Sequence, residues 1–249
     1  DLCQELADSV RSVGGIKMGY YYSLWDWFNP YNDSMKVIRA GDGTHYKKYI
    51  KEVLYPQFRE LVQKYKPALL FSDGDWLADD NYWEIKPLLA QLYNSAINRD
   101  EVIINDRWGK GRGKNGGYYT TEYGSGFENV DKPWEENRGM GHSFGFNRNE
   151  DFTQYNSTKE LVFMLVDLVS RGGNLLLNIG PTSDGRIPVF MQNRLVEIGQ
   201  WLDVNGEAIY GTKPWIKSCQ WSKGNIPKFN TSNYKSGFPI FEVTLNPKP

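Results

Sequence analysis

Three carboxylates in this sequence stand where they could attack or protonate a bond in a substrate. Asp73 lies in the segment Phe71–Trp76, directly after a short apolar run that is typical of a buried strand. Glu122 and Glu135 lie in the long polar and aromatic stretch after the next predicted strand. Hydrolysis of a glycosidic bond needs two carboxyl groups, one that attacks or activates water and one that protonates the leaving group. The sequence permits this chemistry without singling it out, because a strand-end aspartate can also cap a helix and a loop glutamate is usually a solvated surface group.

An arginine and a tryptophan accompany these carboxylates. Arg107 lies in Asn105–Gly109, at the end of another predicted strand, where it could bind a substrate hydroxyl or orient a carboxylate. It could equally pair with Asp106 and tie a loop to the fold. Trp76 offers a face on which a sugar ring could stack, or it belongs to the core.

Composition excludes several other kinds of function. The 29 basic and 30 acidic side chains give a net charge of -1, which argues against a nucleic-acid binder. No apolar run approaches a membrane span. With His45 and His142 as the only histidines, and only two cysteines, the sequence suggests no metal site. It also lacks a P-loop and a G-x-S-x-G elbow, so we expect no metal and no cofactor.

The elements that must position these side chains alternate along the chain. Helices are predicted over 2–13, 45–65, 83–95, 157–170 and 189–204, and strands over 16–23, 68–71, 102–105, 143–146 and 174–179. Strands that are apolar throughout and alternate with helices indicate a parallel sheet buried on both faces. Polar residues follow the strand ends and should gather at one edge of a β/α barrel or of an open doubly wound sheet; they are Ser23, Asp73, Asp106 and Asn178.

The number of predicted units favours part of a barrel. A complete barrel needs eight strands, whereas this chain of 249 residues shows about five β/α units and a β-like tail. We therefore expect the later part of a (β/α)8-like barrel over residues 1–207, without its early strands, and the start of a C-terminal β-rich domain, a β-sandwich, over 208–249. The first residues show neither an initiator Met nor a signal peptide, so we expect a processed, truncated or partial protein.

Several motifs, in order over almost the whole chain, together resemble the α-L-fucosidases of glycoside hydrolase family 29. They are GYYYSLWDWF at 19–28, FSDGDW at 71–76, NDRWG at 105–109, GGYYTTEY at 116–123, SFGFNR at 143–148, GGNLLLNIGP at 172–181 and NGEAIY at 205–210. The resemblance implies a β/α barrel followed by a β-sandwich, and a retaining exo-enzyme that releases α-L-fucose from glycoconjugates. Carried over by motif, Asp73 is the nucleophile and Glu122 the general acid/base, with Glu135 as the alternative acid/base.

The same resemblance implies four sugar-binding residues. Tyr21 and Arg107 match residues that line the sugar site, and Trp76 and Phe144 are expected to form walls for the 5-methyl group of fucose. The family's early strands, which should add further fucose contacts, are not in this sequence. We therefore expect a companion polypeptide or another segment to supply them.

An alternative function belongs to another class of protein. A fucose-binding or structural protein on the same scaffold, with little or no turnover, would also retain the sugar-contact motifs. The expected partner in either case is a fucosylated glycan, and a homo-oligomer is compatible with the sequence. Glycosylation sequons at Asn32, Asn156 and Asn230 slightly favour a secreted or lysosomal location.

Overall fold

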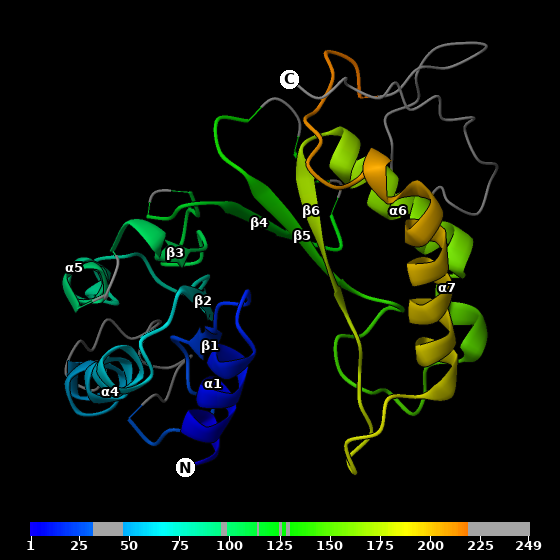
Figure 1. Ribbon diagram of the computed structural model, residues 1–249. Coiled ribbons are helices and arrows are strands. Elements are labelled where there is room, and N and C mark those ends of the chain that lie inside the picture. The colour runs from blue at the N-terminus through cyan, green and yellow to red at the C-terminus, as the bar shows by residue number, and fades with distance from the viewer. Residues whose placement is uncertain (32–46, 96–98, 114, 125, 128–129, 219–249) are drawn as a thin grey trace. The chain divides into compact units, whose positions relative to one another are not determined.

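The computed structural model describes residues 1–31, 47–95, 99–113, 115–124, 126–127 and 130–218. The chain divides into two compact units, Asp1–Tyr119 and Thr120–Pro249, each built on a three-stranded sheet (Figure 1). The predicted positions Asn32, His45, Cys219 and Asn230 lie outside the described residues. In the described parts of the chain, no helix combines the length and the apolar character that a bilayer crossing requires.

The sheet of the first unit is parallel, as predicted. β1 (Gly19–Ser23) pairs with β2 (Leu69–Asp73), and β2 pairs with β3 (Ile103–Ile104), in the order β1-β2-β3. The register places Ser23 opposite Asp73. The strands therefore end at one edge of the sheet, where the polar side chains that follow them gather.

Three helices accompany this sheet, close to their predicted ranges. α1 (Leu2–Val13) is capped by Asp1, whose carboxylate accepts a hydrogen bond from the backbone N–H of Cys3 (3.1 Å). α4 (Tyr55–Tyr65) and α5 (Ile85–Ser95) follow β1 and β2. The π-helix η1 (Ile50–Leu54) leads into α4, because Pro56 in the first turn of α4 crowds the preceding carbonyls and the Tyr55 N–H bonds to Ile50 instead.

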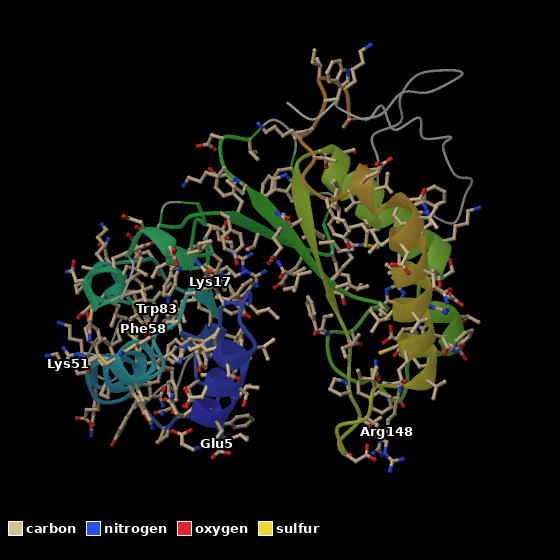
Figure 2. All side chains as sticks on the ribbon, viewed as in Figure 1. Glu5, Lys17, Lys51, Phe58, Trp83 and Arg148 are labelled. Atoms are coloured by element: carbon tan, nitrogen blue, oxygen red, sulfur yellow. The ribbon has the colours of Figure 1, made fainter. Side chains whose placement is uncertain are left out.

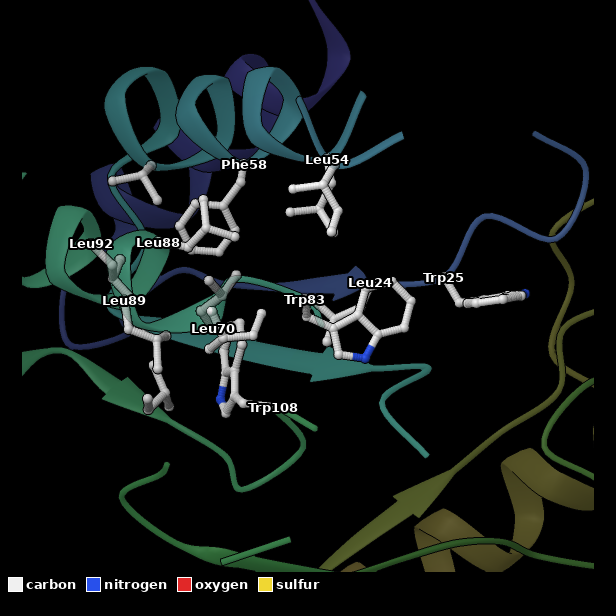
Figure 3. Packing of buried hydrophobic residues seen from close by; sticks show 14 of the residues in the cluster. Leu24, Trp25, Leu54, Phe58, Leu70, Trp83, Leu88, Leu89, Leu92 and Trp108 are labelled. Carbon is white, nitrogen blue, oxygen red and sulfur yellow. The ribbon is translucent and has the colours of Figure 1, made fainter. Parts of the chain in front are cut away.

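The core of the first unit lies between these helices and the sheet. Phe58 of α4 and Trp83, just before α5, are fully buried and point inward, whereas Glu5 and Lys51 project to the outside (Figure 2). Aliphatic and aromatic side chains from both strands and helices close the interior (Figure 3); the cluster includes Leu24, Leu54, Leu70, Leu88, Leu92 and Trp108. This packing fixes β2, and with it the strand end that carries Asp73.

The sheet of the second unit contains β4 (Tyr119–Glu122), β5 (Trp134–Gly139) and β6 (Gly173–Asn178). Their order is β4-β5-β6, and β5 and β6 are parallel, with Trp134 opposite Gly173. A Cβ atom on Gly173 would lie only 2.4 Å from the Trp134 ring, so the indole occupies the space that a larger residue would need. The buried Trp134 thus sets the start of β5 against β6.

Two helices lie next to this sheet (Figure 1). α6 (Thr158–Ser170) begins with a capping box, in which Ser157 Oγ accepts from the Glu160 N–H and Glu160 Oε2 accepts from the Ser157 N–H (2.7 Å). α7 (Val189–Asn205) packs against α6. The predictions over 157–170 and 189–204 are therefore confirmed to within a residue.

Between the third predicted strand and α6, the observed secondary structure differs from the predicted one. A strand over 143–146 was predicted, and this prediction was wrong: residues 143–146 are irregular, and Phe144, Gly145 and Phe146 are exposed rather than buried. The strands of this stretch are β4 and β5, in segments that we took for loops. Residues 209–218 contain no strand, and the predicted β-rich domain over 208–249 otherwise falls outside the described residues.

Candidate active site

The carboxylate of Asp73 is held from two sides at the end of β2. Tyr21 Oη, from β1, donates a hydrogen bond to Asp73 Oδ2 (2.9 Å), and Arg107 Nη1 donates to Oδ1 (3.0 Å). Arg107 is almost fully buried, and its guanidinium carbon lies 5.0 Å from the centre of the Phe71 ring. Asp73 keeps about a fifth of its side-chain surface exposed (20%). The site therefore presents an oriented carboxylate that a substrate could approach.

Tyr21 acts in this group as a neutral donor. Burial of the phenol, together with the nearby charge of Asp73, raises the pKa of Tyr21 to about 12. Its ring stacks on Phe71 at 6.1 Å, and yet 61% of the residue is exposed. A hydroxyl that stays protonated far above neutral pH can donate to Asp73 over the whole physiological range.

A buried side chain holds the backbone next to Asp73. The amide of Asn105 bonds to the main chain of Ser72 on both sides: Oδ1 accepts from the Ser72 N–H (3.1 Å) and Nδ2 donates to the Ser72 carbonyl (2.8 Å). Ser72 Oγ in turn donates to the Arg107 carbonyl. Asn105 thereby continues the pairing of β2 and β3 beyond Ile104, and Ser72, which it holds, connects the residue before Asp73 to the backbone of Arg107.

The turn after Asp73 is equally constrained. Gly74 has φ +71°, and a Cβ atom there would come within 2.8 Å of the Trp25 side chain, so this position favours glycine. Asp75 is fully buried and pairs with Arg112 (3.3 Å), and its burial raises the pKa of this carboxyl. Trp76, the predicted stacking residue, is 45% exposed and is not part of the buried core.

The second unit holds the other predicted residues. Glu122 is the last residue of β4 and is exposed, whereas Glu135 is the second residue of β5 and is half-buried. Phe144 is 39% exposed and packs edge-on against Tyr123 at 5.1 Å, so it lies beside the segment that carries Glu122. The structure thus brings Tyr21, Asp73 and Arg107 together in one unit and places Glu122, Glu135 and Phe144 in the other.

The sequence analysis missed Asn105 as a buried bridge, and also a buried ion pair on β5, Glu136–Arg138. The sequence did contain a signal for the Glu136–Arg138 ion pair. Opposite charges two residues apart share one face of a strand, but the segment was taken for a loop, so the spacing went unused. Among the residues that the structure describes, no group of three or more His, Cys, Asp or Glu side chains is arranged to hold a metal ion.

A comparison with known protein families agrees with the motifs and with the arrangement of Tyr21 and Arg107 around Asp73. Residues 1–207 match the family described as "Alpha-L-fucosidase". This chain belongs to the α-L-fucosidase family.

Curated relatives show the same relationship. The chain is 40% identical over 217 residues to an α-L-fucosidase of Dictyostelium discoideum, covering 86% of this chain and 46% of that protein. It is 37% identical over 244 residues to the human tissue α-L-fucosidase (97% and 51%) and 43% identical over 219 residues to the rat plasma α-L-fucosidase (86% and 47%). The chain therefore spans about half the length of the curated relatives that it matches.

Solved structures of bacterial enzymes are also similar. A Thermotoga maritima α-fucosidase in complex with fucose superposes with a TM-score of 0.65 at 36% identity, over 89% of this chain and 49% of that one. The α-L-fucosidase isoenzyme 1 of Paenibacillus thiaminolyticus gives a TM-score of 0.72 at 27% identity, over 88% and 56%. The similarity to known structures thus covers most of this chain as well.

Proposed function

We propose that this chain supplies the catalytic carboxylates of a retaining exo-α-L-fucosidase, which releases L-fucose from fucosylated glycoconjugates. One observation carries the proposal: in a member of this family, a strand-end aspartate, Asp73, accepts hydrogen bonds from Tyr21 and Arg107 on its two oxygens. Two donors on one carboxylate hold it in a single orientation. This suits a nucleophile, which must meet the anomeric carbon in line with the bond that breaks.

In the first step, Asp73 attacks the anomeric carbon of the fucose unit. The bond between that carbon and the leaving oxygen breaks, and the carboxyl group of Glu122 gives its proton to that oxygen. The products of this step are a β-linked fucosyl ester on Asp73 and the released glycan. The negative charge of Asp73 is lost as the ester forms, while that of Glu122 appears.

In the second step, the Glu122 carboxylate takes a proton from a water molecule, and the water oxygen attacks the anomeric carbon. The ester bond to Asp73 breaks, and fucose leaves with the α-configuration retained. Glu135, which the motif resemblance also offers for this role, is the alternative acid/base; it is the second residue of β5 and is half-buried.

Two aromatic residues are proposed to recognise the sugar. Trp76 and Phe144 both present exposed aromatic surface, and the 5-methyl group of fucose is an apolar feature that such rings can cover. Arg107 has further N–H groups that can donate to sugar hydroxyls, whereas the single hydroxyl hydrogen of Tyr21 is given to Asp73, so Tyr21 can accept a hydrogen bond from a sugar hydroxyl. No metal or cofactor takes part in the proposed steps.

The test is hydrolysis of 4-nitrophenyl α-L-fucoside by the purified natural protein, followed by NMR from the first turnover. We expect nitrophenol release, and α-L-fucose as the first-formed anomer. A first product in the β-configuration would contradict the double displacement. Binding of fucose without turnover would instead favour the alternative, a fucose-binding or structural protein.

We further propose that another segment or chain pairs with β1. β1 is an end strand of its sheet, so one edge of it lacks a neighbouring strand within the described sheet. Next to it in sequence, α1 exposes Leu2, Leu6 and Val13, and Ile16 is exposed as well. A β/α segment that pairs with this edge would bury these apolar side chains. Intact-mass measurement of the natural protein tests this, because the segment must appear as added mass or as a second species.

The names of the relatives bear on location. Tissue and plasma α-L-fucosidases are among them, and we propose a secreted or lysosomal location for this protein. Of the three sequons, Asn156 is described, and its side-chain amide donates to the Met140 carbonyl (2.9 Å). A glycan at Asn156 would have to compete with this bond. Fractionation of cells and medium, with fucosidase activity as the readout, tests the location.

A further inference from the structure

The turn that follows β4 is anchored by a buried ion pair on β5. Glu136 Oε1 accepts hydrogen bonds from Arg138 Nη2 (2.7 Å), from Arg138 Nε (2.9 Å) and from the Gly124 N–H (3.1 Å). Glu136 Oε2 accepts from Thr121 Oγ1, and Arg138 Nη2 also donates to the Gly124 carbonyl (3.1 Å). Both charged side chains are almost fully buried. The pair therefore bonds to the residue before Glu122 and to the second residue after it.

Tyr123 completes the attachment. Its backbone has φ +49°, a conformation that non-glycine residues rarely adopt, and its N–H bonds to the Asn137 carbonyl (3.4 Å). Its hydroxyl accepts from the Gly139 N–H (2.9 Å), and the Arg138 guanidinium lies 5.5 Å from the ring centre. Every residue flanking Glu122 from 121 to 124 is thus bonded to β5, while Glu122 itself is exposed.

Stability alone is a weak reason for such a pair. Burying two charges removes their hydration, and a well-packed apolar pair often stabilises a fold as well or better. What an apolar pair cannot do is hold a turn by several directed hydrogen bonds, including one to a backbone N–H and one to a backbone carbonyl. The bonds of Glu136 and Arg138 end on the turn that carries Glu122, which indicates a role in placing that carboxyl group.

We propose that Glu136 and Arg138 are positioning residues that fix the turn after β4 and thereby the place of Glu122. The proposal rests on the proposed function to the extent that Glu122 is the acid/base. A general acid must lie within hydrogen-bond reach of the leaving oxygen, so a loosened turn should impair protonation more than it impairs binding. Loss of the pair should therefore produce a weaker form of the kinetic defect that loss of Glu122 itself produces.

The experiment compares Glu136→Gln with Asp167→Asn in the complete protein. Asp167 forms the other buried ion pair described in this unit, with Arg171 of the α6 region, so both variants leave a buried arginine opposite a neutral amide. Arg171 also donates to the Phe127 carbonyl (3.5 Å), three residues after Gly124. The Asp167→Asn variant is therefore a strict control, because it disturbs a contact close in sequence to residues 121–124 but not within them. The substrates are 4-nitrophenyl α-L-fucoside, with a good leaving group, and a fucosyl-galactose disaccharide, with a poor one.

For Glu136→Gln we expect kcat/KM to fall at least about tenfold more for the disaccharide than for the aryl fucoside, since only the poor leaving group needs the acid. Asp167→Asn should lower both by the same factor. Amide hydrogen exchange over residues 121–124 should accelerate in Glu136→Gln and stay unchanged in Asp167→Asn. Equal losses on both substrates, with unchanged exchange, would show that the pair is merely structural and would overturn the proposal.

Two further variants keep the result decisive. If Glu136→Gln does not fold, Thr121→Val removes the hydrogen bond from Thr121 Oγ1 to Glu136 Oε2 and should shift both readouts in the same direction by a smaller factor; no shift in either would overturn the proposal. Glu122→Ala is measured in parallel. If Glu122→Ala shows no leaving-group dependence, the acid assignment in the proposed function fails, and the exchange readout alone decides whether the pair holds the turn.

Discussion

The side chain of Tyr21 on β1 reaches diagonally to Asp73 on the neighbouring strand β2. In the parallel register Tyr21 lies opposite Phe71, and Ser23 lies opposite Asp73, yet the Tyr21 hydroxyl lies 2.9 Å from Asp73 Oδ2. The long phenol spans the two-residue offset while its ring rests on Phe71. The carboxylate is therefore oriented by a side chain whose own position is fixed by stacking.

The first prediction concerns that hydrogen bond. Tyr21→Phe keeps the stacked ring and removes one donor to a charged group, which is worth about 1.5–3 kcal/mol. We expect kcat/KM to fall by about 10- to 100-fold in a variant that still folds. The matched control is Tyr22→Phe, because the next tyrosine of the strand bonds to Gln57 (3.1 Å) and packs on Phe58 instead. Equal effects in the two variants would remove Tyr21 from the mechanism.

The second prediction concerns alkaline pH. Folding raises the pKa of Tyr21 from its usual value of 10.0 to about 12, so the folded state favours the neutral phenol. Its contribution to stability is then complete below pH 10 and is lost as the pH rises toward 12. The difference in denaturation midpoint between wild type and Tyr21→Phe should be constant up to about pH 10 and shrink above it. A difference that shrinks between pH 7 and 9 would contradict this assignment.

The third prediction concerns the nucleophile. Asp73→Asn should abolish turnover and leave the fold intact, because the amide has the same shape and cannot attack. Asp73→Ala opens space for a small anion, so added azide should restore cleavage of activated aryl fucosides. Direct attack by azide on an α-fucoside inverts the anomeric carbon, and the product should be the β-fucosyl azide. Wild-type rates in Asp73→Asn would exclude Asp73 as the nucleophile.

The fourth prediction distinguishes Glu122 from Glu135. Loss of the acid should slow substrates with poor leaving groups far more than aryl fucosides. Azide should then intercept the β-linked intermediate and yield the α-fucosyl azide, the opposite anomer to the nucleophile variant. We expect this pattern from Glu122→Ala, and we expect Glu122 rather than Glu135 to lie nearer Asp73. If only Glu135→Ala gives it, the two roles must be exchanged.

The fifth prediction concerns completeness. Residues 1–249 expressed alone should be insoluble or inactive, because the edge of β1 and the apolar side chains of α1 would face water. Solubility, thermal melting and activity on the aryl fucoside are the measurements. An active monomer of residues 1–249 with a cooperative melting transition would show that no further segment is needed.

Most of the described fold could be predicted because its strands and helices carry plain apolar patterns. β2 and β6 are short apolar runs between turn residues, and α6 carries apolar residues at helical spacing on one face. The strand-end position of Asp73 follows directly from such a pattern. Its partner Arg107 was a candidate from its own strand-end position, although a purely structural ion pair was equally open, whereas Tyr21 required the family resemblance.

The failures have a common physical cause. β5 reads as a loop because Glu136 and Arg138 are charged, and only their mutual pairing lets them be buried. Conversely, Ser143–Phe146 reads as a strand although Phe144 and Phe146 are exposed. β3 is only two residues long because the side chain of Asn105 replaces further main-chain pairing. A one-dimensional pattern records polarity but not pairing, and pairing decides the structure of β3 and β5.

The indole of Trp134 fills the space above Gly173. Substitutions at the two positions are therefore coupled. A larger side chain at 173 requires a smaller one at 134, so neither position can change by itself without a clash. Glu135 and Glu136 follow Trp134 immediately on β5, so the packing of Trp134 on Gly173 also holds the start of the strand that carries them. Among diverging copies of this gene, we therefore expect replacements at 134 and 173 to occur together.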